Sequence, residues 1–165
     1  MGQRFWVFFL VGLAVVGAAI FGAFYSNRGS HVQLAGSILK VRTYPDGNGT
    51  LVFADFRVIN PSQLPFVVSS VQMSMETPDG EVAMATALSK SDADKIVKYY
   101  KLMGPKYNDV LSIQDKLPPV STVDRMAAGR FNFPAKFLES RKTLRLRIEE
   151  VDGVAAEITE KPSVP

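Results

Sequence analysis

Residues 51–61 read LVFADFRVINP, and this stretch decides the fold. Its side chains alternate between two faces, with Val52, Ala54, Phe56 and Val58 on one and Phe53, Asp55 and Arg57 on the other. A period of two predicts a half-buried β-strand with an apolar face turned inward and a charged face turned outward. We expect it to end at Asn60-Pro61, because proline lacks a backbone N–H and steers the preceding residue away from helix.

Similar patterns recur along the chain. Strands are predicted over residues 32–44, 66–75, 82–88, 126–133, 143–150 and 154–159, with turn sequences such as PDGNG (45–49) and PDG (78–80) between them. In residues 32–44 the apolar side chains change from even-numbered to odd-numbered positions near Leu39, as they do at a bulge or on an edge strand. About seven short strands at regular spacing predict an antiparallel β-sandwich. A parallel α/β sheet is disfavoured, since nearly every strand would need a crossover helix.

Residues 91–103 change the period. Ser91 with Asp94 three residues on resembles a helix N-cap, and apolar positions follow at Ile96, Tyr99, Tyr100 and Met103. This spacing predicts one amphipathic helix of about three turns, which Gly104-Pro105 ends. We therefore expect a mainly β domain with a single helical insertion.

Residues 51–62, with Leu64-Pro65-Phe66 and the strand through Met75, resemble the late-embryogenesis-abundant type 2 domain, also called the WHy domain. The likeness covers residues 34–80. It implies an immunoglobulin-like sandwich that frequently follows a membrane anchor, with a stress or envelope association. It implies no catalytic residues.

The N-terminus predicts a membrane anchor. Residues 5–24, FWVFFLVGLAVVGAAIFGAF, form an uncharged run, and twenty helical residues cover roughly 30 Å, the thickness of a bilayer core. A cleaved signal peptide is the alternative, although its apolar region has about 7 to 15 residues. We expect an anchor in residues 1–27, a sandwich domain in residues 28–161 and a flexible tail in residues 162–165.

The orientation of the anchor follows from two opposed considerations. Arg4 and the amino terminus precede the span, whereas Arg28, Lys40 and Arg42 follow it, which favours a cytoplasmic domain. A very short N-terminal tail is typical of a signal anchor, and a long following domain crosses regardless of its charges. We predict a single-pass protein of the plasma (inner) membrane, with the domain on the external or periplasmic side.

Within the span, Ala14, Ala18 and Gly22 recur every four residues. Small residues at this spacing let a second membrane helix approach closely, so they form a candidate helix-partner face. The expected partners are therefore membrane lipid along residues 5–24 and a second membrane protein.

Composition excludes several functions. The chain has 19 basic and 16 acidic residues, too even a balance for a nucleic-acid-binding surface. It has no cysteine, and its one histidine, His31, stands in the linker, so no catalytic, metal or cofactor site is predicted. The loop at Asp46 lacks the later ligands of a calcium site and is interpreted as a hairpin turn. We do not expect an enzyme.

The predicted helix offers the best surface. Its charged side carries Lys95, Lys98 and Lys101, and its aromatic residues are Tyr99 and Tyr100. One interpretation packs the aromatic stripe on the core; the other has these residues meet lipid headgroups or a protein partner.

Two functions follow from these observations. The first is a non-enzymatic accessory or protein-binding subunit at the cell envelope. The alternative is an external domain that binds a small ligand or lipid in a groove between its sheets.

Overall fold

The structure is a computed structural model that describes residues 3–27, 34–100 and 104–160. It divides into two compact units, Met1–His31 and Val32–Pro165. Lys101, Met103 and the predicted tail at residues 162–165 lie outside the described residues.

The first unit contains helix α1 (Gln3–Asn27), whose side chains are described for Trp6 and for residues 9–22. Every one of these side chains is exposed. Within the described residues, no helix is found that is long and apolar enough to cross a membrane. The predicted span over residues 5–24 thus gains no support from the structure and stays a prediction.

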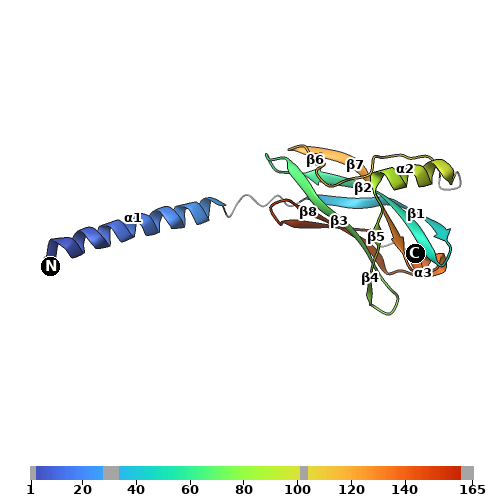
Figure 1. Ribbon diagram of the computed structural model, residues 1–165, viewed down its shortest axis with the longest axis horizontal. Helices are drawn as coiled ribbons and strands as arrows, with labels where there is room; N and C mark the ends of the chain where they lie inside the picture. Colours follow the sequence, from blue (N-terminus) through green and yellow to red (C-terminus); the bar gives the residue numbers. More distant parts are fainter. Residues whose placement is uncertain (1–2, 28–33, 101–103, 161–165) are drawn as a thin grey trace. The chain divides into compact units, whose positions relative to one another are not determined.

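The second unit is built from two antiparallel sheets (Figure 1). One has the strand order β1-β2-β7-β5, and the other has the order β4-β3-β8-β9 with β6 beside β3. The strands are β1 (Ala35–Asp46), β2 (Gly49–Asn60), β3 (Phe66–Glu76), β4 (Val82–Met84), β5 (Thr86–Ala87), β6 (Lys116–Leu117), β7 (Ser121–Phe131), β8 (Thr143–Glu150) and β9 (Ala155–Thr159). The helices are α2 (Lys90–Tyr99) and α3 (Ala135–Glu139). The prediction of a mainly β domain with antiparallel sheets is confirmed. The expectation of a single helix in the domain is corrected, because the short helix α3 joins β7 to β8.

The parity shift predicted near Leu39 is a β-bulge. Ile38 pairs with Phe56 and Lys40 pairs with Asp55, so Leu39 is the extra residue on β1. Its side chain is exposed. An inserted residue reverses the faces of all that follow, which is why the apolar pattern changes there.

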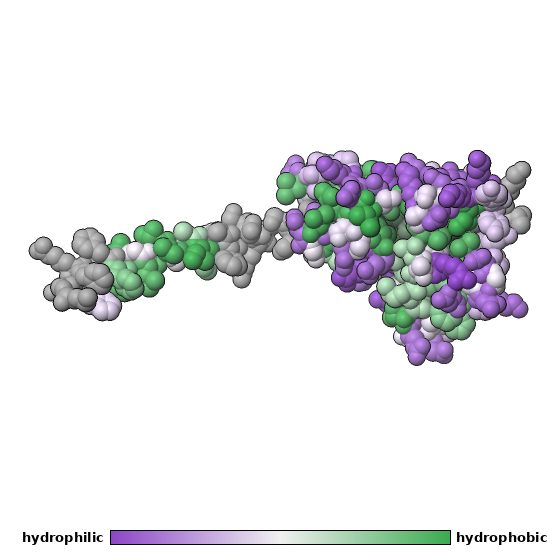
Figure 2. Space-filling view, viewed as in Figure 1, coloured by the Kyte–Doolittle hydropathy of each residue, from purple (hydrophilic) through white to green (hydrophobic). Residues whose placement is uncertain are grey.

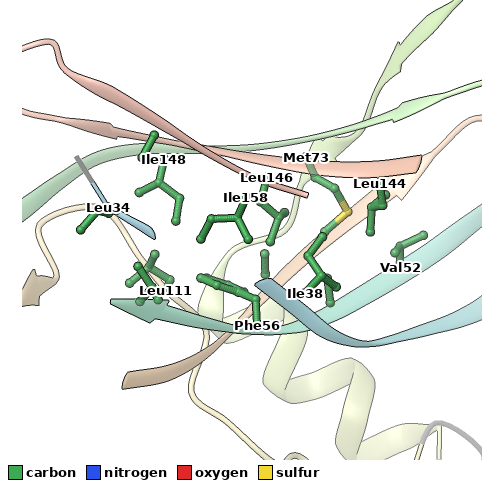
Figure 3. Packing of buried hydrophobic residues seen from close by; sticks show 14 of the residues in the cluster. Leu34, Ile38, Val52, Phe56, Met73, Leu111, Leu144, Leu146, Ile148 and Ile158 are labelled. Carbon is green, nitrogen blue, oxygen red and sulfur yellow. The ribbon is translucent and has the colours of Figure 1, made fainter. Parts of the chain in front are cut away.

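The core lies between the two sheets (Figure 3). Phe56 from one sheet packs in the same cluster as Leu146 and Ile158 from the other. The alternation expected in residues 143–150 is confirmed, because Leu144, Leu146 and Ile148 are fully buried. These side chains hold the sheets together by removing apolar area from water.

One expectation for β2 was wrong. Phe53 and Asp55 were assigned to an outward face, yet both are buried, because α2 and the segment 104–110 cover this side of the sheet. Arg42 on β1 links Asp55 to this segment: its Nη2 lies 3.0 Å from Asp55 Oδ2, and its Nη1 donates to the carbonyl of Pro105 at 3.0 Å. Asn108 Nδ2 donates to the other Asp55 oxygen at 3.0 Å. A paired and hydrogen-bonded carboxylate tolerates this burial.

Three further boundaries differ from those predicted. The expected strand over residues 82–88 is two short strands that belong to different sheets, β4 and β5. The strand predicted to begin at residue 126 starts at Ser121. The helix expected over residues 91–103 runs from Lys90 to Tyr99 instead. It begins earlier than predicted because Ser89, and not Ser91, is the N-cap residue.

Candidate functional site

The candidate site is an apolar groove of about 510 Å³ at one edge of the sandwich. β3 forms one wall and β7 the other, and the connection from β5 into α2 and the loop at residues 110–113 complete it. Its lining residues are Ser70, Val71, Met73, Ala87, Leu88, Ser89, Lys90, Val110, Leu111, Ser112, Ile113, Ala127 and Ala128. Figure 2 shows apolar surface on this face of the domain, between the regions labelled β3 and β7 in Figure 1.

The groove exists because the chain changes sheets beside it. β4 pairs with β3 and β5 pairs with β7, so the chain crosses between the sheets at Ala85, whose N–H donates to the Met73 carbonyl at 2.9 Å. After β5 the chain leaves the edge and forms α2 over the outer face of the sheet. The space between β3 and β7 beyond the crossing is therefore left open.

The edge of β3 along this groove has a gap in its pairing. On the side away from β8, β6 pairs with Phe66–Val67 and β4 pairs with Ser74–Glu76. Inside this interval the backbone of Val68 bonds to Gln114 and Asp115, and the Met73 carbonyl accepts the N–H of Ala85. Among the residues that the structure describes, the stretch without a backbone partner on this side is therefore residues 69–72. Part of the groove wall is thus an open sheet edge.

Most of the polar groups in the lining are already engaged. The Ser70 hydroxyl donates to Glu149 Oε2 at 3.0 Å, and the Ser89 hydroxyl accepts the N–H of Asp92 at the start of α2. The N–H of Ser112 donates to Asp115 Oδ2 at 2.8 Å. Lys90 is exposed and contributes a cation. The groove therefore offers apolar contact along its length and one positive charge.

Glu149, beside the groove, is held ionised. Hydrogen bonds from Ser70 and Arg147 lower the pKa of its carboxyl group, and the Arg147 charge adds to the effect. A carboxylate with a lowered pKa is a poor general acid at neutral pH. The Glu149 carboxylate is therefore suited to accept hydrogen bonds rather than to donate a proton.

The face of α2 that packs on the domain differs from the one predicted. Ala93 is buried and Ile96 and Val97 pack beside it, against a second apolar cluster that includes Phe53 and Met126. Tyr99 is 82% exposed. The expected stripe of Ile96, Tyr99, Tyr100 and Met103 is therefore corrected to one centred on Ala93, Ile96 and Val97.

Tyr99 and Tyr100 have different environments. Tyr100 follows the last residue of α2, and its ring lies 4.6 Å from that of Tyr44, centroid to centroid. Tyr99 shares the solvent-facing side with Lys95 and Lys98, which are both exposed. Lys95 Nζ lies 4.0 Å from Asp92 Oδ1, which is a loose ion pair. Of the candidate partner surface, Lys95, Lys98 and Tyr99 therefore face solvent, and Tyr100 is 40% exposed beside Tyr44.

The candidate helix-partner face of α1 is also exposed. Ala14, Ala18 and Gly22 all present their surface to solvent, and nothing lies within 4 Å of a Cβ built on Gly22. Their spacing places them on one side of the helix. Among the described residues, none is found packed against these three, so their role stays a prediction.

Two other sequence features have structural roles. Asp46 does not sit in a cation site: its carboxylate pairs with Arg130 at 2.7 Å. Asn60 is buried and bonds to backbone groups at the end of β2, as expected for a residue at a strand end. Within the described residues, no group of three or more potential metal ligands occurs.

The groove was not located from the sequence. Its one detectable signal is Ala85, which separates two short strand patterns within residues 82–88 and marks the crossing between sheets. The gap on β3 depends on pairings among distant segments, which local periodicity does not contain.

Searches of protein-family models, of curated proteins and of solved structures found no match to this chain. The resemblance of residues 34–80 to the late-embryogenesis-abundant type 2 domain therefore stays a prediction from the sequence motif.

Proposed function

We propose that this chain is a membrane-anchored, non-enzymatic β-sandwich that binds an apolar ligand, of the class of a lipid acyl chain, in the groove between β3 and β7. The groove itself carries the proposal. Its volume of about 510 Å³ falls within the range of small-molecule sites, and its lining is mainly aliphatic with an exposed cation at Lys90. A ligand with an apolar tail and an anionic or polar head suits that distribution.

The anchor is part of the proposal. Its support is the uncharged run at residues 5–24 and the exposure of large apolar side chains around α1, such as Phe9, Leu13 and Phe21. Apolar area left in water costs free energy, and lipid would cover it on every side of the helix. The domain would lie on the external or periplasmic side.

The sandwich is proposed to be of the immunoglobulin type. In that fold one sheet has the order ABED, and the other contains C, F and G. The sheets β1-β2-β7-β5 and β4-β3-β8-β9 follow this order when β1 is taken as strand A and β4 as an added strand next to C. This agrees with what the resemblance of residues 34–80 implies.

Uptake of a fluorescent apolar probe by a fragment that begins at Ser30 tests the groove. The fragment retains every residue of both apolar clusters. We expect saturable, stoichiometric uptake, and we expect Ala87→Trp to abolish it by filling the groove. Thr86→Trp is the matched control, because it lies next to Ala87 on β5 but does not line the groove. Uptake that Ala87→Trp leaves unchanged would contradict the proposal.

A second candidate function is an accessory subunit that binds another envelope protein. The observation that favours it is the exposure of Tyr99 beside Lys95 and Lys98, since an exposed aromatic residue is typical of interfaces. Purification of the full chain in mild detergent would show whether a protein accompanies it. In this case replacing Tyr99 by serine releases that protein, whereas Ala87→Trp does not.

A further inference from the structure

One end of the sandwich is apolar at the tips of its loops. This is the end at which β1 begins, and its connections are residues 61–65, 112–115, 118–120 and 151–154. Each carries one strongly exposed aliphatic side chain: Leu64 at 54%, Ile113 at 68%, Val120 at 65% and Val151 at 65%. We call these four residues the apolar tip.

Backbone hydrogen bonds hold the four connections in place. The N–H of Val120 donates to the Ser62 carbonyl at 2.9 Å, and that of Val151 donates to the Val67 carbonyl at 3.1 Å. The N–H of Gln114 donates to the Val68 carbonyl at 2.8 Å. The apolar tip is therefore a fixed part of the surface.

Backbone strain occurs at the same place. Gln114 and Val120 have φ values of 70° and 46°, and they are the non-glycine residues with positive φ in the part of the chain that the structure describes. For a β-branched residue such as Val120 this conformation is a genuine outlier. Strain of this kind persists where the surroundings enforce it, and it gathers at functional surfaces.

The opposite end of the sandwich has polar turns. Residues 46–49 are Asp-Gly-Asn-Gly and join β1 to β2. Residues 78–81 are Pro-Asp-Gly-Glu and join β3 to β4. Both ends use turn residues, such as Gly47 at the polar end and Asp152-Gly153 at the apolar end, and Val82 beside the second polar turn is 62% exposed. What distinguishes the apolar end is that each of its four connections carries an exposed aliphatic side chain.

Covalent linkage limits how far the apolar end can lie from α1. Six residues separate Asn27 of α1 from Leu34, and seven Cα–Cα steps reach at most about 25 Å. Ala35 pairs with Ile59, at the end of β2 that leads into residues 61–65. If α1 lies in the bilayer, the membrane surface is within reach of this end at all times, at high effective concentration.

We infer that the apolar tip rests in the interfacial zone of the membrane that holds α1. The inference rests on the proposed anchor. The charged residues in or next to the four connections are Asp115, Lys116, Glu150 and Asp152, of which only Lys116 is positive, so apolar contact would drive the association without a need for anionic lipid. Ile113 also lines the groove, so this contact brings the groove next to the acyl chains it is proposed to bind.

The test uses the full chain in phosphatidylcholine vesicles. Because the chain has no cysteine, Leu64→Cys, Val120→Cys and Val151→Cys each give one attachment site for an environment-sensitive fluorophore. Asn48→Cys, exposed at the opposite end, is the matched control. We expect the three tip labels to be blue-shifted and quenched by lipids that carry a nitroxide, with no change for Asn48→Cys.

Four outcomes would overturn the inference. Equal emission from tip and control labels, in chains that float with the vesicles, would reject the contact and leave the anchor intact. Failure of the chain to float would reject both. Quenching that requires phosphatidylglycerol and disappears in salt would assign the contact to lysine side chains instead. Tip labels shielded from iodide in native membranes but not in vesicles would indicate a protein partner and also reject it.

Discussion

The side-chain amide of Asn60 donates to the backbone carbonyl of Leu64 at 2.9 Å. The same nitrogen lies 3.2 Å from the carbonyl oxygen of Leu117 and 3.1 Å from that of Pro118. The side-chain oxygen of Asn60, Oδ1, accepts the N–H of Ser62. One buried side chain thus joins the connection after β2 to the turn after β6. It supports two of the four segments that carry the apolar tip.

Asn60→Ala should destabilise the domain. The substitution leaves buried carbonyl groups without their donor, and each such group costs about 1 to 3 kcal/mol. We expect the free energy of unfolding to fall by about 2 to 4 kcal/mol in urea denaturation of the Ser30 fragment. Asn60→Asp, similar in shape, should not restore stability, because it directs an acceptor at the same carbonyls; a stable Asn60→Asp fragment would contradict this role.

Replacing Val120 by asparagine should stabilise the domain. Asparagine tolerates a left-handed backbone, so Val120→Asn should relieve strain and raise the free energy of unfolding by about 1 kcal/mol. Val151→Asn is the control, since it changes a similarly exposed residue at the same end. Equal unfolding curves for the two variants would show that Val120 carries no strain.

The inner and outer sides of α2 should respond differently. Ile96 packs against the second apolar cluster, so Ile96→Ala should lower the free energy of unfolding by about 1 to 3 kcal/mol. Lys95→Gln together with Lys98→Gln should change it by well under about 1 kcal/mol, because exposed charges contribute little. If the thermal melt of Ile96→Ala matched that of the parent fragment, the packing of this helix would be wrong.

The ion pair between Arg57 and Asp124 should make the free energy of unfolding depend on pH. A hydrogen bond from Arg57, whose Nε lies 2.7 Å from Asp124 Oδ1, lowers the pKa of that carboxyl group. The folded pKa lies below the unfolded one, so the contribution to stability is complete above the unfolded pKa and is lost as pH falls through the folded pKa. Carboxyl NMR titration should show the Asp124 pKa rising in Arg57→Gln, and an unchanged pKa would refute the pairing in solution.

The topology has a direct test as well. Protease added to intact cells, or to spheroplasts where an outer envelope shields the domain, should digest the chain after about residue 28. Protection until lysis would place the domain on the cytoplasmic side. Release of the domain without any membrane-retained fragment would favour a cleaved signal peptide.

The sequence predicts elements whose faces differ in polarity. β8 was predicted with its bounds and its buried residues, because Leu144, Leu146 and Ile148 alternate with charged neighbours. The bulge at Leu39 was visible for the same reason. Such patterns are local, so one sequence contains them in full.

The features that the sequence did not predict depend on which distant segments pack against a sheet. Phe53 and Asp55 stand where solvent was expected, and only the covering by α2 and residues 104–110 explains their burial. The groove likewise depends on where the chain crosses between sheets at Ala85. No periodicity within one segment reports such distant contacts. Tyr99 was likewise placed on the wrong side of α2, because contacts with Phe53 and Met126 turn Ala93, Ile96 and Val97 inward.

The bulge at Leu39 has a further consequence for chains confined to a surface. β1 is a long strand at the edge of its sheet, and anchored copies of the domain would meet in two dimensions at high density. A long regular edge invites pairing between molecules and aggregation. The extra residue at Leu39, the charge of Lys40 and the missing N–H of Pro45 interrupt that edge at separate points. We expect them to keep neighbouring domains apart however crowded the membrane becomes.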